Sequence, residues 1–184
     1  MLDEKFDDIN HDASPWTPAI KYGIIWALLN IIIQIGSFLT GNLEKTMNGE
    51  ALLSSIIMGA IGLAIIIFMI YKAVGDHKIN RGGRISFGQA VSVGALTGLI
   101  YGLVTAIWTF VFYTFIFTGY ESLMNDAMIA QYEGMDMDED MIETSMNFAG
   151  MFVKPVFLAI FAIPGGVLTG TIVSLIIGAI MKTD

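Results

Sequence analysis

The chain has 184 residues, of which 55% are hydrophobic and 14% are charged, and its formal net charge at pH 7 is −8. A soluble domain of this size could not bury so much apolar surface, so the composition excludes an ordinary globular protein and indicates an integral membrane protein. The negative charge argues against a nucleic-acid partner, and the lack of cysteine excludes disulfides and thiolate chemistry.

The beginning of the chain is acidic and polar, whereas a cleavable signal peptide has a basic start and an apolar centre. We predict an acidic, disordered cytoplasmic tail over residues 1–17 and a single membrane domain over residues 18–184. We expect the first apolar segment to be retained as the element that targets the protein to the membrane.

Four uncharged runs are long enough to cross a bilayer, for which about 20 apolar residues suffice. They are Tyr22–Leu43, Ala51–Tyr71, Ile85–Tyr120 and Pro155–Met181. We predict an all-α integral membrane protein with four transmembrane helices, at about 20–42, 51–71, 88–118 and 152–181. The third run has 36 residues, which as a helix would reach roughly 54 Å against a hydrocarbon core of about 30 Å, so it must protrude from the membrane.

The first span has one small and polar face. Its most polar members, Asn30 and Gln34, lie one helical turn apart, and an unpaired amide in hydrocarbon costs several kcal/mol, so each needs a hydrogen-bond partner. Hydrogen bonds between helices are one interpretation of this face. A solute or ion site in the bundle is the other, and its candidate residues are Asn30, Gln34 and Ser37.

Small residues recur at every fourth position in the third and fourth spans. This spacing favours close packing of helices, in which dispersion contacts between backbones replace the hydrophobic drive that lipid removes. The pattern does not say whether the partner helix belongs to the same chain or to another subunit. The predicted packing residues are Ala90, Gly94, Gly98, Gly102 and Ala106, preceded at the same spacing by Ser86, and Ala162, Gly166, Gly170, Ser174 and Gly178.

The segment between the third and fourth spans holds eight acidic residues, no basic residue and seven methionines between Glu121 and Met151. Apolar residues at helical spacing predict an external helical hairpin, in which the first helix ends at Gly134 and the second begins at Asp136 or Asp138. Copper(I) at Met135, Met137 and Met141, or a hard cation at Asp136, Asp138, Asp140 and Glu143, is the alternative. Neither set has a recognised ligand spacing, so we interpret the methionines as packing and expect no metal and no cofactor.

Basic residues predict the orientation, because lysine and arginine in short loops are retained in the cytoplasm. The loop between the second and third spans carries Lys72, Lys78, Arg81 and Arg84, which places both termini in the cytoplasm. These charges could also hold anionic lipid headgroups, although the orientation rule alone explains them.

Membrane-embedded catalysis is not expected, because the four uncharged runs contain no carboxylate and both histidines, His11 and His77, lie outside them. The same absence argues against a proton-coupled transporter. Pro164, followed by Gly165 and Gly166, predicts a kink in the fourth span, and a broken helix at a transport site is the alternative.

Two stretches, "KYGIIWALL" and "GRISFGQAVSVG", together with the acidic external segment, resemble the bacterial membrane-protein family called domain of unknown function 4199, common in Bacteroidota. The resemblance covers roughly Pro18 to Met181, and its most specific part is Gly83–Ala90. It implies a multi-pass inner-membrane protein and supplies no activity and no functional residue.

We therefore expect a non-enzymatic scaffold or subunit that assembles through its glycine-rich helix faces. Its partners would be the lipid bilayer and either a second copy of the chain or another membrane protein. The alternative is a small channel or transporter that uses the polar site on the first span. A continuous polar cavity reaching Asn30 and Gln34 would support that alternative.

Overall fold

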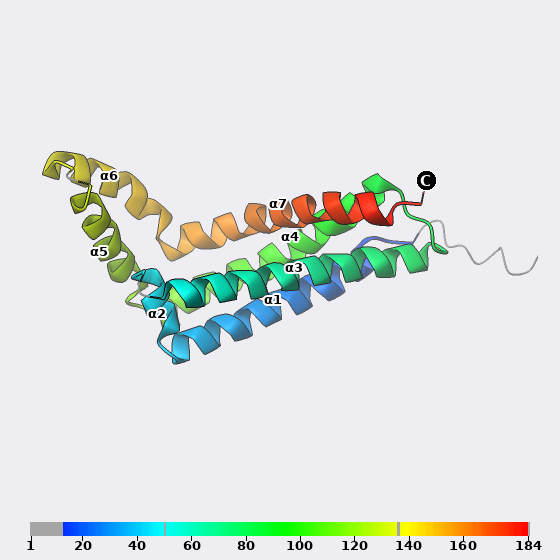
Figure 1. Ribbon diagram of the computed structural model, residues 1–184, viewed down its shortest axis with the longest axis horizontal. Helices are drawn as coiled ribbons and strands as arrows, with labels where there is room; N and C mark the ends of the chain where they lie inside the picture. Colours follow the sequence, from blue (N-terminus) through cyan, green and yellow to red (C-terminus); the bar gives the residue numbers. More distant parts are fainter. Residues whose placement is uncertain (1–12, 50, 136, 184) are drawn as a thin grey trace, which may run out of the picture.

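A computed structural model describes residues 13–49, 51–135 and 137–183, and within them every element is a helix. Figure 1 shows four long helices: α1 (Trp16–Leu39), α3 (Leu52–Asn80), α4 (Phe87–Val111) and α7 (Pro155–Met181). The π-helical turn η1 (Phe112–Ile116) continues α4. Three shorter helices, α2 (Asn42–Met47), α5 (Tyr120–Glu133) and α6 (Glu139–Phe152), lie in the connections.

The four long helices are each long and apolar enough to cross a membrane, which confirms the expectation of an all-α protein with four membrane-length helices. The start of α1 and the end of α7 lie at the same end of the molecule, and α5 and α6 lie at the opposite end (Figure 1). Most of the predicted tail, residues 1–12, lies outside the described residues.

The bounds of α1 and α3 differ from the predicted spans, and α7 begins at Pro155 rather than at residue 152. Helix α1 begins at Trp16 rather than near residue 20, and it ends before Gly41, whose φ of 68° turns the chain into α2. Helix α3 continues to Asn80, well past Tyr71, where the uncharged run stops. The uncharged run ends at Lys72 because that residue is charged. A helix can continue through charged residues at the membrane surface, so the end of an apolar run does not predict the end of the helix.

The turn from α3 into α4 is built from glycine and a helix cap. Gly82 and Gly83 adopt φ angles of 67° and 84°, a region in which a side chain would be strained. The Ser86 Oγ then accepts a hydrogen bond from the backbone N–H of Gln89 at 3.3 Å, and the Gln89 Oε1 accepts one from the N–H of Ser86 at 3.0 Å. This capping box satisfies two donors that the first helical turn would otherwise leave unpaired, so α4 begins at Phe87.

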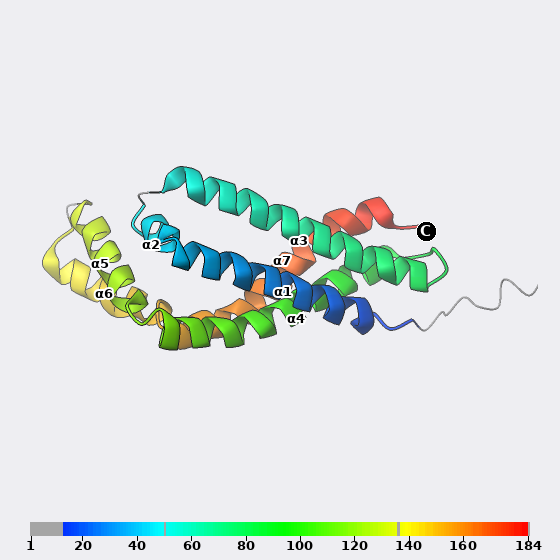
Figure 2. The same ribbon diagram turned by 90° about the horizontal axis from the view of Figure 1, so that it is seen from below.

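Two clusters of buried side chains hold the bundle together. One joins α1, α3, α4 and α7 near the end of the molecule at which α1 starts and α7 ends, with Trp26, Ile70, Val74 and Val93 at most 1% exposed. The other lies at the opposite end around Phe112 and includes Phe117, Tyr120 and Val153. Figure 2 shows that α3 runs apart from α4 and α7 toward this second end, and the side chains of that part of α3 are largely exposed.

Candidate packing and binding sites

The predicted small residues of α4 and α7 face one another in antiparallel order. An added Cβ at Gly94 would collide with the Ser174 side chain, and one at Gly98 would collide with the backbone carbonyl of Gly166. Further along, a Cβ at Gly102 would come within 2.8 Å of the Ala162 carbonyl oxygen. At the other end, a Cβ at Gly178 would lie 3.1 Å from the Ala90 Cβ. The two stripes therefore form one seam, which we call the α4–α7 seam and which lies within a single chain.

Close backbone contact explains why the seam consists of small residues. At Gly98, Gly166 and Gly170, the atom that a Cβ would strike is a backbone carbonyl oxygen of the opposite helix, which cannot rotate away. Such contacts require glycine and bring many backbone atoms within dispersion distance. Ser174 is fully buried, and its hydroxyl donates to the Thr171 carbonyl at 2.8 Å, so its polar atom is satisfied inside the seam.

Three of the predicted residues stand apart from this close contact. The side chains of Ala106 and Ala162 are half-buried at the end of the seam nearer α5, where Ala162 contributes its backbone carbonyl to the contact with Gly102, and Ser86 caps α4 instead of packing on α7. Helix α7 continues through Pro164 as one α-helix, so the break proposed as an alternative for this span is not present. Gly165, next to the seam residue Gly166, has open space where its Cβ would be.

The polar face of α1 is brought against α4 and η1 through Gln34. The Trp108 Nε1 donates to the Gln34 Oε1 at 2.7 Å, and the Gln34 Nε2 donates to the Tyr113 hydroxyl at 3.1 Å. Both halves of the amide are thus satisfied by side chains of a neighbouring helix. Asn30 and Ser37 are half-buried, and among the described residues neither side chain has a hydrogen-bond partner. The structure therefore gathers one of the three predicted polar residues into a polar contact.

Sequence reasoning did not find the partners of Gln34. Trp108 and Tyr113 are separated by five positions, which a regular α-helix would turn by about 140° from one another. Both side chains nevertheless reach the same amide, Trp108 from the last turn of α4 and Tyr113 from the π-helical turn that follows it. The usable signal was that an indole or a phenol in an apolar run also needs a partner.

A second contact between α1 and α4 lies nearer the termini. A Cβ at Gly23 would come within 2.7 Å of the Ile100 Cβ and 2.8 Å of the Thr97 carbonyl oxygen. One turn along, Trp26 stacks on Tyr101 with ring centroids 3.7 Å apart. Gly23 therefore lets α1 approach α4 closely enough for the two aromatic rings to stack.

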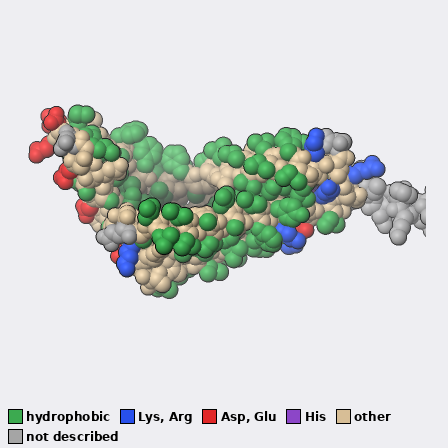
Figure 3. Space-filling model, viewed as in Figure 1, with side chains coloured by type: hydrophobic (Ala, Val, Ile, Leu, Met, Phe, Trp, Pro, Cys, Tyr) green, Lys and Arg blue, Asp and Glu red, His purple; other side chains and the backbone are tan. Residues whose placement is uncertain are grey.

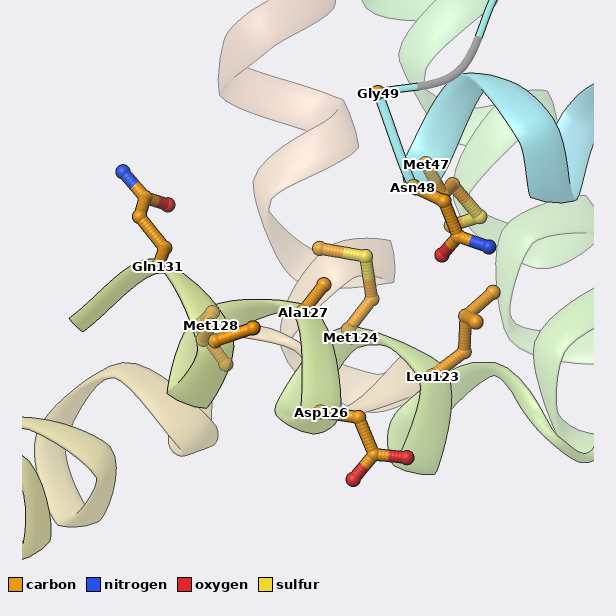
Figure 4. A pocket seen from close by; sticks show the side chains of 10 residues that line it. Met47, Asn48, Gly49, Leu123, Met124, Asp126, Ala127, Met128 and Gln131 are labelled. Carbon is orange, nitrogen blue, oxygen red and sulfur yellow. The ribbon is translucent and has the colours of Figure 1, made fainter. Parts of the chain in front are cut away.

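A pocket of about 540 Å³ lies between α5 and the segment around α2. Figure 4 shows Met124 extending from α5 toward Met47 of α2, whereas Asp126 points to the other side of α5. Both methionines also pack against the cluster around Phe112. Burial there, with the neighbouring Tyr113 and Glu121, raises the pKa of the Tyr120 phenol to about 12.

The residues considered for metal binding lie elsewhere. Met135 and Met141 are 59% and 55% exposed on the outer segment, and Asp136 lies outside the described residues. No three histidine, aspartate or glutamate side chains lie close enough to hold a metal in the part of the chain that the structure describes. Asp138 stands at the N-cap of α6 without a side-chain capping bond, and Gly134 ends α5. The absence of a bound metal in the protein stays a prediction.

Basic residues gather at the end of the molecule where α1 starts and α7 ends, and acidic residues gather over α5 and α6 at the other end (Figure 3). At the basic end, Asp76 of α3 accepts hydrogen bonds from the Tyr22 hydroxyl at 2.7 Å and from the Lys21 Nζ at 3.2 Å. Lys78 donates to the backbone carbonyl of Met181 at 2.8 Å. These contacts join α3 to α1 on one side and to the end of α7 on the other.

A pocket of about 240 Å³ at the same end is lined by Arg81, Arg84 and the capping residues of α4. Thr183 also lines it and is held against Ile85, because its hydroxyl accepts a hydrogen bond from the N–H of Ile85 at 2.8 Å and its N–H donates to the Ile85 carbonyl at 3.0 Å. A further pocket of about 430 Å³ is bordered by Ala13, Gly88 and the 2%-exposed side chain of His77. The connection between α3 and α4 is therefore held by hydrogen bonds to the end of the chain after α7.

The stretch Gly83–Ala90 has a physical reason for its composition. Gly83 supplies a positive φ, Ile85 is 2% exposed, Ser86 and Gln89 form the capping box, and Ala90 meets Gly178 in the α4–α7 seam.

Comparisons with curated proteins and with solved structures give no match. A family model described as "Protein of unknown function (DUF4199)" matches residues 21–183. Because this match covers nearly the whole chain, the protein belongs to the DUF4199 family.

Proposed function

We propose that the protein is a non-enzymatic scaffold or subunit in the bacterial inner membrane, where it assembles through a helix face rich in small residues. Four membrane-length apolar helices and the placement of charge at the two ends support the membrane location. The uncharged runs contain no carboxylate and no histidine, which supports a role without catalysis.

The face that carries this proposal lies on α3, because the α4–α7 seam is already occupied inside the chain. Gly59 and Gly62 of α3 have nothing within 4 Å of the position of a Cβ. Their apolar neighbours on the same part of the helix, including Ile56 at 61% exposed and Leu53 at 71% exposed, are likewise uncovered. A helix of another protein could approach the backbone here as closely as α7 approaches α4.

The channel or transporter alternative has weaker support. Gln34, the most promising polar residue of α1, uses its amide oxygen on Trp108 and its amide nitrogen on Tyr113. These bonds support a role in joining α1 to α4, because both polar atoms of the amide are already engaged by side chains of the same chain.

Site-specific photo-crosslinking tests the proposed assembly. A photo-crosslinking amino acid at position 56, in place of Ile56, should capture a second protein chain in intact membranes, either another copy or a different membrane protein. The control is position 107 on α4, where Ile107 is 70% exposed but has no open glycine face beside it; there we expect crosslinks to lipid alone. Lipid crosslinks alone at both positions would rule out assembly through α3.

A further inference from the structure

An apolar groove of about 490 Å³ runs between α3 and α7. One wall consists of Leu63, Ile67 and Tyr71, which follow one another at four-residue spacing on α3. The other wall is the last part of α7, from Ile172 to Met181, and Ile177, only 6% exposed, forms the floor. Every lining residue is apolar or aromatic, so the groove offers hydrocarbon contact and no hydrogen-bonding group in its depth.

Positive charge stands at one end of this groove. Met181, the last groove residue of α7, accepts a hydrogen bond through its backbone carbonyl from the Lys78 Nζ at 2.8 Å, which places an ammonium group at the groove mouth. Lys182 directly follows Met181 in the chain. The acidic residue of this part of α3, Asp76, is engaged by Tyr22 and Lys21 on the side of α1.

The groove between α3 and α7 ends near lysines. It therefore has the two parts of a phospholipid site, an apolar surface for an acyl chain and positive charge for the headgroup. An acyl chain can pack in an apolar groove between two helices, and lysines near the headgroup region attract anionic lipid. The exposed ring of Tyr71 lies beside the groove mouth, where an amphipathic aromatic side chain prefers the membrane interface. The apolar groove and the positive charge at its end therefore both favour an anionic phospholipid.

We propose that the α3–α7 groove binds an acyl chain of an anionic phospholipid whose headgroup is held by Lys78, with Lys182 beside it. This inference rests on the membrane location in the proposed function, but it does not depend on assembly through Gly59 and Gly62. Contact with the lysines would make the site prefer anionic over zwitterionic lipid. Dependence of binding on the groove would separate this two-part site from simple attraction of lipid to a basic surface.

The test is native mass spectrometry of the full-length protein released from mixed micelles containing equal amounts of phosphatidylglycerol and phosphatidylcholine. The wild type should retain phosphatidylglycerol in preference, and Lys78→Gln should lower that preference by about fivefold, the effect of one lysine near an anionic surface. The control Lys45→Gln, at the opposite end of the bundle, should leave the preference unchanged. Equal retention of both lipids by the wild type would overturn the proposal.

A second pair of variants tests the groove without changing charge. Ile176→Trp fills the groove and should lower retention of phosphatidylglycerol, whereas Leu168→Trp, on the same helix outside the groove, should not; the two side chains are 63% and 62% exposed. Equal retention by these two variants would contradict the proposed acyl-chain site. If Lys78→Gln fails to fold, Lys182→Gln takes its place and should weaken the same preference. Loss of crosslinking at position 56 with lipid selectivity intact would instead contradict the proposed assembly alone.

Discussion

At the scale of single residues, Gly165 and Gly166 show how closely the α4–α7 seam depends on the absence of a side chain. A Cβ at Gly166 would collide with the Gly98 carbonyl oxygen and lie 3.1 Å from the Gly102 Cα, whereas a Cβ at Gly165 would meet nothing within 4 Å. We expect Gly166→Ala to destabilise the protein by about 1–3 kcal/mol, as overpacking does in a dense core. Thermal unfolding in matched detergent measures the effect.

The neighbouring substitution Gly165→Ala is the control, because it adds the same methyl group to the same helix. Alanine favours a helix over glycine by about 1 kcal/mol, so this variant should melt at or above the temperature of the wild type. If both variants melt at the same temperature, the seam does not hold α4 and α7 together. The hydrophobic effect cannot restore the lost contact, because lipid tails are as apolar as the helix surfaces and only close packing holds the helices together.

At the scale of helices, the bonds from Gln34 to Trp108 and Tyr113 dock α1 on the outer half of α4. Gln34→Leu would leave the indole N–H of Trp108 without its partner, and we expect a loss of about 0.6–1.7 kcal/mol, the range measured for such bonds between membrane helices. Asn30→Leu is the matched control, since the described residues give Asn30 no hydrogen bond. It should be neutral or stabilising. Equal losses in the two variants, measured by thermal unfolding in the same detergent, would mean that the amide bond does not dock α1.

The same helices show what periodicity in a sequence can reveal. The four-residue spacing identified the faces of α4 and α7 that pack, because a helix repeats its faces at that interval. It could not identify the partner, since a stripe describes one surface and not the element that covers it. The π-helical turn at Phe112 was also beyond prediction, because a local change of hydrogen-bond register leaves no mark in hydropathy.

At the scale of the whole molecule, the predicted count of four spans follows from composition, whereas the shape of their ends does not. Uncharged runs located α1, α3, α4 and α7, but the extension of α3 to Asn80 and the join between Ile85 and Thr183 depend on contacts between distant segments. The α3–α7 groove likewise depends on contacts between distant segments. Leu63 and Ile176 carry no sign in the sequence that they line one surface, because helix crossing, and not helical period, brings them together.

The charge at the two ends predicts how the bundle lies in the membrane. Bases gather beside both termini and acids over α5 and α6, so the basic end should face the cytoplasm. Because the chain has no cysteine, a single introduced one reports its own position. Asp138→Cys, at the start of α6, should react with an impermeant thiol reagent on intact spheroplasts. Asn80→Cys, at the end of α3, should react only after the membrane is permeabilised. Labelling in the reverse order would place the basic end outside and move the proposed phospholipid site to the outer leaflet. Labelling of both positions in intact cells would contradict insertion of the four helices as a bundle.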